Sequence, residues 1–240
     1  PPVLHRTLLT QGIGESYLSD LISSWENNLP DHIKLAYLPS PGLVRLRLTA
    51  TGKQEELLRE EIKIQEKQLL ELIGDYVYGF DDDTLETIIG QLLRNRKMTI
   101  ATAESCTGGY IAHRITSVPG SSEYFLGAVI AYANQIKTNE LNVAADIIKT
   151  FGAVSEQVVK LMAENVRTKF NTNYSIAVSG IAGPGGGSEE KPVGLVYIAV
   201  AGPENTKTLK LNLGSTRERI IRETSLYAMN TLRKMLLSEV

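Results

Sequence analysis

Hydrophobic and polar positions follow two different periods in the first eighty residues of the chain. Within residues 43–48 the even-numbered positions are apolar and the odd-numbered ones include Arg45 and Arg47, an alternation that predicts a half-buried strand. Residues 54–73 carry apolar side chains at helical spacing between charges, which predicts an amphipathic helix. The sequence therefore predicts a small α+β module over residues 1–82. Its predicted elements are a helix at 15–25, strands at 34–38 and 43–48, and a helix at 54–73.

The pattern changes after residue 82, where helical periods begin to alternate with short apolar runs. Such alternation is typical of an α/β domain in which helices cover both faces of a sheet. The last two apolar runs lie close together, so we expect them to be antiparallel neighbours in a mixed sheet. Residues 83–240 are thus predicted to form a three-layer α/β/α domain. The predicted helices are 84–96, 107–117, about 135–142, 155–170 and 216–238, and the predicted strands are 98–103, 126–133, 174–180, 193–201 and 206–213.

Composition and charge narrow the class of protein. The 240 residues are 42% hydrophobic and 22% charged, with a net charge of -2, which fits a soluble globular chain and lacks the basic excess of proteins that bind nucleic acid through phosphates. No run reaches the roughly 18 apolar residues of a membrane span, and no signal peptide opens the chain. We therefore expect a cytoplasmic protein with no nucleic-acid or membrane partner. Because the chain has no initiator Met, we expect a fragment or a processed form.

The cysteine and histidine content limits the possible metal and redox chemistry. Cys106 is the single cysteine, so an intrachain disulfide is excluded. One cysteine and three scattered histidines cannot form a structural zinc site. We expect neither a metal site nor a bound cofactor.

The densest chemical signal lies at residues 99–109, where an apolar run leads into hydroxyl residues and two glycines before a predicted helix. In an α/β sheet this places Ser105 at the carboxyl end of a strand, where ligands bind. It also places Ser105 near a helix N-terminus, whose free N–H groups favour an anion or an oxyanion. Either Ser105 or Cys106 could be a nucleophile. Alternatively, the hydroxyl residues only cap the helix and the glycines only allow close packing.

A nucleophile of this kind needs a base, and no histidine is well placed to serve. Lysine is the alternative, since its pKa falls readily on burial. Residues 128–137 read as a strand that runs to Tyr132, followed by a turn that carries Lys137. If the two strands are parallel, Tyr132 lies at the same end of the sheet as Ser105. Taken alone, Lys137 could equally be an ordinary surface lysine.

Two further segments could hold an anion. Residues 178–188 contain five glycines within eight positions, so their backbone could approach a ligand closely and present N–H groups to it. The segment matches neither the Walker pattern nor the dinucleotide fingerprint, and the alternative is a flexible connector. Near the start of the last helix, which Ser215 or Thr216 is expected to cap, Arg217 opposes the helix dipole. A cation there makes sense if it faces an anionic ligand.

Five blocks of the sequence together resemble the signature of the CinA family, the competence/damage-inducible proteins, over residues 84–238. The blocks are residues 102–109, 119–122, 132–137, 152–156 and 179–194. The resemblance implies an amidase that hydrolyses nicotinamide mononucleotide to nicotinate mononucleotide and ammonia. It also implies that Ser105, Tyr132 and Lys137 are catalytic, with Tyr132 orienting Lys137 or relaying its proton. We expect the start of the 107–117 helix and the glycine segment to bind the substrate and its oxyanion. The residues expected to bind substrate are Thr107, Gly108, Gly109, Gly180, Gly183, Gly185, Gly186 and Arg217.

Residues 1–82 resemble the KH-like connecting domain of full-length CinA proteins, where it follows a larger N-terminal domain. The Gly-x-x-Gly loop that clamps RNA in KH domains is missing, because Gly12-Ile13-Gly14 has the wrong spacing. Acidic residues also outnumber basic ones in residues 53–83. We therefore expect a spacer or a dimerisation module, and a homodimer or a larger homo-oligomer.

Two other functions compete with an amidase. The first is a non-catalytic protein that binds a phosphorylated ligand in the glycine segment, or a scaffold linked to competence or DNA damage; ammonia release separates it from an enzyme. The second is an oxidoreductase of the short-chain Tyr/Lys type. That class needs Tyr-x-x-x-Lys and a dinucleotide loop, whereas the spacing from Tyr132 to Lys137 is one residue longer and the loop is missing. We therefore exclude it.

Overall fold

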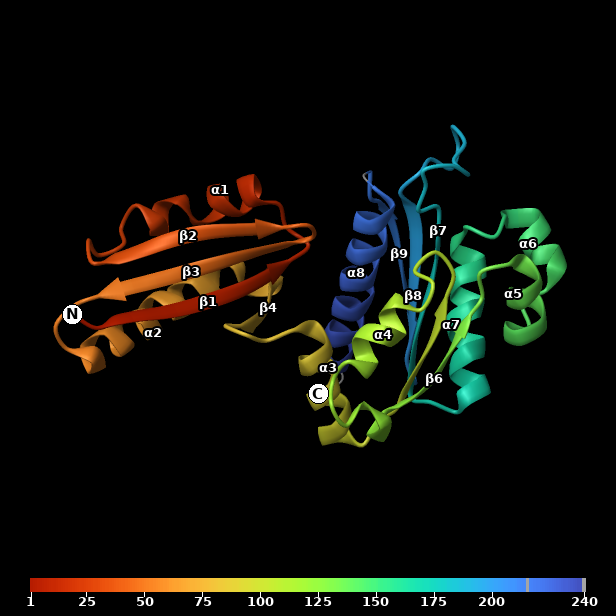
Figure 1. The fold of residues 1–240 in the computed structure, drawn as a ribbon, viewed down its shortest axis with the longest axis horizontal. Helices are drawn as coiled ribbons and strands as arrows, with labels where there is room; N and C mark the ends of the chain where they lie inside the picture. The colour runs from red at the N-terminus through yellow and green to blue at the C-terminus, as the bar shows by residue number, and fades with distance from the viewer. Residues whose placement is uncertain (215, 239–240) are drawn as a thin grey trace. The chain divides into compact units, whose positions relative to one another are not determined.

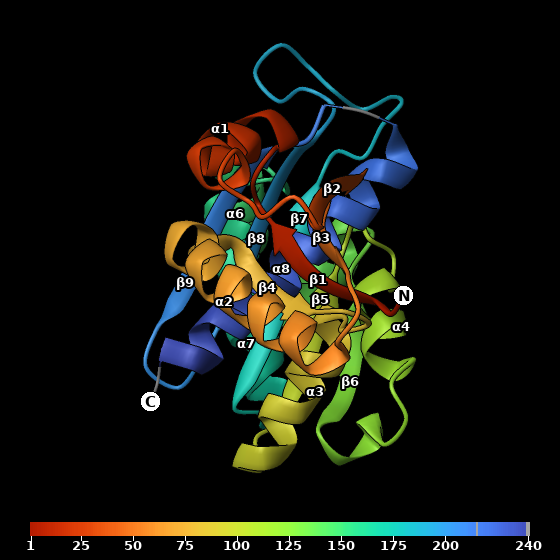
Figure 2. The same ribbon diagram turned by 90° about the vertical axis from the view of Figure 1, so that its left-hand side faces the viewer.

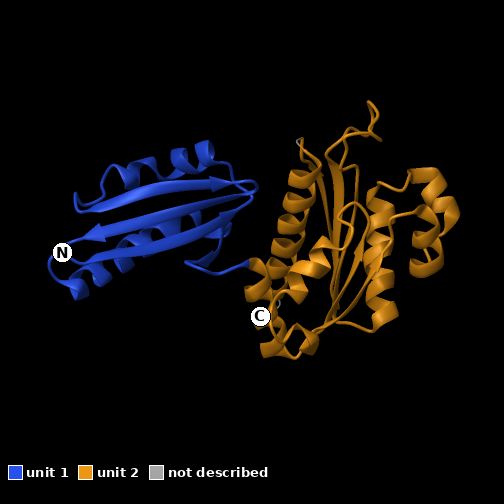
Figure 3. Cartoon of the chain, viewed as in Figure 1, with its two compact units in different colours: residues 1–84 blue, residues 85–240 orange. Residues whose placement is uncertain are grey.

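The computed structural model describes residues 1–214 and 216–238. Ser215, one of the two predicted caps of the last helix, lies outside the described residues. The chain divides into two compact units, residues 1–84 and residues 85–240 (Figure 3). No helix within the described residues is both long and apolar enough to cross a lipid bilayer.

The first unit is a four-stranded antiparallel sheet in the order β2-β3-β1-β4, with two helices on one face (Figure 2). The alternation in residues 43–48 is realised as predicted: Val44, Leu46 and Leu48 are buried while Arg45 and Arg47 are exposed. The elements are β1 (Val3–Gln11), α1 (Glu15–Glu26), β2 (Ile33–Ser40), β3 (Leu43–Thr51), α2 (Glu55–Ile73), η1 (Gly74–Tyr76) and β4 (Val77–Phe80).

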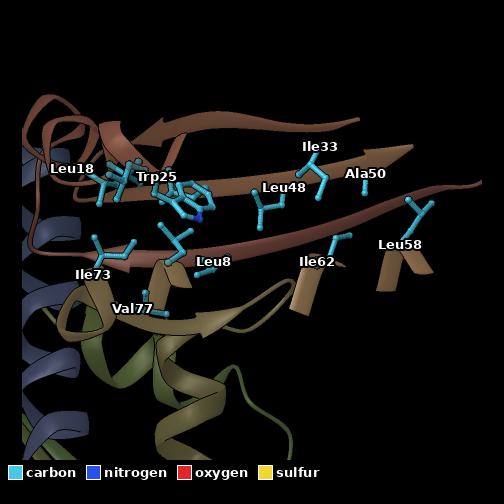
Figure 4. Close-up of a cluster of buried hydrophobic side chains, with 14 residues drawn as sticks. Leu8, Leu18, Trp25, Ile33, Leu48, Ala50, Leu58, Ile62, Ile73 and Val77 are labelled. Carbon is cyan, nitrogen blue, oxygen red and sulfur yellow. The ribbon is translucent and has the colours of Figure 1, made fainter. Parts of the chain in front are cut away.

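Side chains from the sheet and from both helices meet in one apolar core in this unit (Figure 4). Leu18 and Trp25 come from α1, Ile62 comes from α2, and Leu8 and Leu48 come from the central strands. Full burial of each large apolar side chain contributes about 1.5–3 kcal/mol. Both helices are therefore packed on this face of the sheet by one shared cluster of apolar contacts.

The prediction of helix, hairpin and helix was incomplete because it missed β1 and β4. β1 pairs with β3 on one side and with β4 on the other, and its last five residues are all buried. Three of those five, Thr7, Thr10 and Gln11, are polar. The hydroxyl of Thr10, for example, donates to the carbonyl of Val44 at 2.8 Å. The strand therefore lacks the apolar–polar alternation by which a half-buried strand is recognised.

The second unit is a five-stranded mixed sheet in the order β6-β5-β7-β8-β9. β5 is parallel to both β6 and β7, whereas β7, β8 and β9 are successive antiparallel neighbours. The predicted mixed sheet and its antiparallel final pair are confirmed. The strands are β5 (Ile100–Glu104), β6 (Phe125–Ile130), β7 (Tyr174–Gly180), β8 (Leu195–Ala201) and β9 (Thr206–Asn212).

Helices cover both faces of this sheet, so the three-layer α/β/α prediction is confirmed (Figure 1). α7 packs its buried stripe, which includes Val159 and Met162, against small residues such as Ala101 and Ala177. Helices α3, α4 and α8 lie on the opposite face. The helices are α3 (Leu85–Arg96), α4 (Tyr110–Thr116), η2 (Ser121–Glu123), α5 (Asn134–Leu141), α6 (Ala145–Phe151), α7 (Glu156–Phe170) and α8 (Arg217–Ser238). Helix α6 was not predicted, because it has seven residues and buries none of them, so it carries no strong apolar stripe.

We predict that Leu48→Ala destabilises the first unit by about 2–5 kcal/mol, because it removes a fully buried side chain from a packed core. Trp25 is the only tryptophan of the chain and lies in the same core, so its fluorescence during urea unfolding reports this unit. Leu57→Ala is the matched control, since Leu57 is 53% exposed, and it should change stability by less than about 0.5 kcal/mol. Equal midpoints for the two variants would contradict this assignment of the core.

Candidate active site

The site lies where the parallel strands β5 and β6 end. Ser105 directly follows β5, Tyr132 lies two residues beyond β6, and Lys137 is in the first turn of α5. Because parallel strands present their carboxyl ends at one edge of a sheet, these segments converge there. Tyr132 and Ser105 are thus at the same end of the sheet, as the sequence analysis anticipated.

Lys137 reaches back from α5 to the end of β5 and makes three polar contacts. Its Nζ is 3.1 Å from Ser105 Oγ, 2.7 Å from the carbonyl oxygen of Ala131 and 3.4 Å from that of Tyr132. A neutral amine has two hydrogens to donate and one lone pair. Since the two carbonyl oxygens can only accept, they take the two hydrogens. The lone pair is then left for the Ser105 hydroxyl, which is the arrangement that a general base requires.

The surroundings of Lys137 favour its neutral form. The side chain is only 1% exposed, and burial is the main cause that lowers its pKa from the ordinary 10.5. Among the described residues, no carboxylate lies within ion-pair distance of it. A surface lysine, the alternative that the sequence left open, is therefore wrong for this residue.

Tyr132 occupies a different place from the one expected of it. Its side chain is 59% exposed, and its hydroxyl accepts a hydrogen bond of 2.9 Å from Arg217 Nη2. What contacts Lys137 is the Tyr132 backbone carbonyl. The expectation that the Tyr132 hydroxyl orients Lys137 is thus corrected: that hydroxyl is paired with Arg217.

Glu104 is a residue of this site whose importance the sequence analysis missed. Its side chain is completely buried. Its carboxylate accepts hydrogen bonds from the backbone N–H groups of Gly109, Ile111 and Ala112 at 2.8–3.1 Å and from the Thr107 hydroxyl at 2.7 Å. A carboxylate suits this position because it satisfies the free donors at the N-terminus of α4 and matches its dipole. This role could have been predicted from the sequence, because a glutamate stands at the end of an apolar run and just before a predicted helix.

Glu104 changes which backbone groups a substrate could use. The structure starts α4 at Tyr110, three residues later than predicted, because Gly108 and Gly109 adopt positive φ values of 60° and 99°. The expectation that the start of the helix holds the oxyanion is therefore wrong for the N–H groups that Glu104 occupies. Among the described residues, no oxygen accepts the N–H groups of Cys106 and Thr107. The Cys106 N–H contacts its own thiol sulfur, so the Thr107 N–H is the donor left for an oxyanion.

Cys106, the rival nucleophile, is 5% exposed. Burial raises its pKa to about 12. A thiol with that pKa is almost entirely protonated at neutral pH, and the thiolate is the reactive form of cysteine. The environment therefore favours Ser105 over Cys106 as the nucleophile.

A pocket with a volume of about 220 Å³ opens beside Ser105 and Lys137. Of the residues expected to bind substrate, only Gly180 and Arg217 are in its lining. Thr107 and Gly109 instead donate hydrogen bonds to the Glu104 carboxylate. The other glycines lie outside the lining. Five of its wall residues were not predicted from the sequence: Asn134, Ala153, Val154, Ser179 and Ala182. The pocket is lined by Ser105, Cys106, Tyr132, Asn134, Lys137, Ala153, Val154, Ser179, Gly180, Ala182 and Arg217.

The glycine segment contributes to the site mainly through its first half. Gly180 follows the buried part of β7 and lines the pocket. The carbonyl of Gly183 accepts a hydrogen bond of 2.7 Å from Arg217 Nη1, so this segment helps to hold Arg217. Gly185 and Gly186 are exposed.

Within the described part of the chain, no group of three or more His, Cys, Asp and Glu side chains is placed to hold a metal ion. The polar groups that line the pocket include the Ser105 hydroxyl, the buried amine of Lys137 and the guanidinium of Arg217. Such a set fits a substrate with a polarised carbonyl and a negative charge.

Each of the two units matches a known protein family. The family described as "CinA C-terminal domain" matches residues 82–236, and the family described as "Damage-inducible protein CinA KH domain" matches residues 5–79. Together the two matches cover nearly the whole chain.

Similar proteins agree with these matches. The chain is 52% identical to a CinA-like protein of Cytophaga hutchinsonii over 98% of the chain and 56% of that relative. It is 47% identical to a CinA-like protein of Flavobacterium psychrophilum over 100% of the chain and 57% of that relative. The chain thus spans little more than half the length of these relatives.

Among solved structures, the competence/damage inducible protein CihA of Agrobacterium tumefaciens is 36% identical with a TM-score of 0.61. The match covers 63% of this chain and 94% of that one. A CinA superfamily protein of Klebsiella pneumoniae is 29% identical with a TM-score of 0.62, over 64% of this chain and 96% of that one. Sequence and structure agree, and the chain belongs to the CinA family.

Proposed function

We propose that the second unit is an amidohydrolase that converts nicotinamide mononucleotide to nicotinate mononucleotide and ammonia. The observation that carries the proposal is the 3.1 Å contact between Ser105 Oγ and the buried Nζ of Lys137. A serine beside a desolvated amine is a known way to activate a hydroxyl without histidine. The substrate itself is the one that the resemblance to the CinA family implies.

In the proposed first step, Ser105 Oγ attacks the carboxamide carbon while neutral Lys137 takes the hydroxyl proton. The carbonyl oxygen becomes an oxyanion, and the N–H group of Thr107, which no oxygen of the described residues accepts, is the donor available to stabilise it. Lys137 then returns its proton to the amide nitrogen. The C–N bond breaks, ammonia leaves, and the acyl group stays on Ser105 as an ester.

In the second step, Lys137 accepts a proton from a water molecule that attacks the ester carbonyl. The ester bond breaks, the proton returns to Ser105 Oγ, and the new carboxylic acid releases its own proton to water, so nicotinate mononucleotide leaves as a carboxylate. Lys137 thus acts in turn as base and acid in both half-reactions. Tyr132 and Arg217 take a positioning role in this scheme, because their side chains contact each other rather than Lys137.

The charge of Arg217 supports a substrate that is an anion. Its two terminal nitrogens donate to the carbonyl of Gly183 and to the hydroxyl of Tyr132, both of which are neutral. Its positive charge is therefore not neutralised by an acid among the described residues. A phosphorylated substrate would supply the missing negative charge.

We predict that ammonia release from nicotinamide mononucleotide falls by about 10³-fold or more in Ser105→Ala and in Lys137→Ala, because each change removes one half of the activated nucleophile. Cys106→Ala is the matched control and should keep most of the activity, since its thiol is protonated. The measurement is enzyme-coupled detection of ammonia. A folded native chain that binds the nucleotide but releases no ammonia would identify a binding protein instead, and activity lost only in Cys106→Ala would identify a cysteine nucleophile.

We predict a rise of kcat/KM with increasing pH whose midpoint lies below pH 10.5. Only neutral Lys137 can accept the proton, so activity grows as the pH rises through its pKa. Burial lowers that pKa from 10.5, which moves the rise toward neutral pH. The profile is measured from pH 5 to 11 with the same ammonia assay. A rise centred at or above 10.5, or a fall over this range, would show that a buried lysine is not the base.

We predict that Glu104→Gln lowers kcat and also destabilises the chain by about 1–3 kcal/mol. The glutamine NH₂ would face backbone N–H groups that now donate to the carboxylate, so at least one donor loses its acceptor. Thermal unfolding followed by circular dichroism and the ammonia assay measure the two effects. Glu190→Gln, an exposed carboxylate of the same unit, is the control. If both variants behave like the native chain, the buried carboxylate does not hold the nucleophile loop.

A further inference from the structure

The pocket beside Ser105 is too small for the substrate of the proposed reaction. Its volume is about 220 Å³, below the roughly 300–1,000 Å³ of sites that enclose a drug-sized ligand. It could take the ring that carries the carboxamide. The rest of a nucleotide must then extend beyond this pocket, so a second binding region has to adjoin it.

A second hollow, with a volume of about 430 Å³, shares one wall residue with the pocket. That residue is Arg217, which lines both cavities. The other lining residues are Tyr110 at the start of α4 and Glu218, Ile221 and Arg222 on α8. A ligand with its carboxamide at Ser105 would therefore pass Arg217 and enter this hollow.

The residues from α8 that line the hollow lie one turn apart on the same face of the helix. Arg217 and Ile221 are four positions apart, and so are Glu218 and Arg222, a spacing that brings side chains together. Tyr110 and Ile221 are half-buried and supply apolar surface, whereas Glu218 and Arg222 are exposed. The hollow thus combines an apolar wall with two cations and one carboxylate.

Arg222 is the cation best able to bind a ligand in this hollow. Arg217 already donates from both terminal nitrogens to protein oxygens. Among the described residues, by contrast, no hydrogen bond or ion pair engages the guanidinium of Arg222. A guanidinium with free donors is the group that binds a phosphate most directly.

We propose that this hollow, lined by Tyr110, Glu218, Ile221 and Arg222, binds the ribose 5-phosphate part of a mononucleotide substrate. Arg222 holds the phosphate, and the carboxylate of Glu218 accepts hydrogen bonds from ribose hydroxyls, as acidic residues do in other nucleotide sites. Arg217, which lines both cavities, lies between them and orients the ligand. This inference rests on the proposed function, and it makes the enzyme selective for phosphorylated over unphosphorylated forms of the same amide.

The test compares nicotinamide mononucleotide with nicotinamide riboside, which differs only by the phosphate. In Arg222→Gln, the ratio of kcat/KM for the nucleotide to that for the riboside should fall about tenfold, because a charge-assisted contact to the phosphate is lost. The loss should appear as a higher KM for the nucleotide, since the contact is the same in the ground and transition states. Arg219→Gln is the matched control: Arg219 is on the same helix but bonds Glu223 at 2.6 Å. An unchanged ratio in Arg222→Gln, or an equal fall in both variants, would overturn the subsite.

A binding experiment separates failure of the subsite from failure of the proposed reaction. Ribose 5-phosphate is titrated into the native chain and into Arg222→Gln by calorimetry, which needs no turnover. Weaker binding to the variant, about tenfold, supports the subsite even if the native chain releases no ammonia. Equal binding to both proteins, or no binding to either, overturns it even if the amidase is active.

Discussion

The candidate site in the second unit depends on the burial of one amine, which has no carboxylate of the described residues within ion-pair distance. Removing an ammonium from water is costly, so Lys137 is pushed toward its neutral form, and the carbonyl of Ala131 holds it in place at 2.7 Å. An acid within contact distance would have restored the charged form and made the residue useless as a base. The same burial that lowers the pKa of Lys137 also raises that of Cys106. One environment therefore favours a neutral amine at Lys137 and a protonated thiol at Cys106, as the proposed mechanism requires.

A second buried charge keeps the nucleophile loop in place. The carboxylate of Glu104 draws together the Thr107 hydroxyl and the first N–H groups of α4, which fixes the turn that carries Ser105 between strand and helix. Gly108 and Gly109 make that turn possible through their positive φ angles. Ser105, the proposed nucleophile, is thus positioned by the fold, and Arg217 at the start of α8 lines the same pocket.

The sequence predicted most of this arrangement where a regular pattern was present. The correct fold class followed from the alternation at 43–48, from the helical periods, and from the way strands and helices alternate along the second unit. The candidate site followed from the position of Ser105 after a buried strand. The sequence did not predict β1, because buried polar residues interrupt its apolar–polar alternation. It did not predict α6 either, because that helix buries none of its residues. The partners of Glu104 and Tyr132 could not be predicted either. They depend on which groups the folded backbone brings within hydrogen-bond distance, and neither periodicity nor spacing encodes that.

The proposed mechanism depends most directly on a covalent bond formed at Ser105. Native protein mixed rapidly with nicotinamide mononucleotide, quenched in acid and measured by mass spectrometry should gain the mass of nicotinate mononucleotide less one water. Fragmentation should place the added group on Ser105, and Lys137→Ala should form it far more slowly. An adduct on Cys106, or hydrolysis within a single turnover with no covalent species at any time point, would contradict the account.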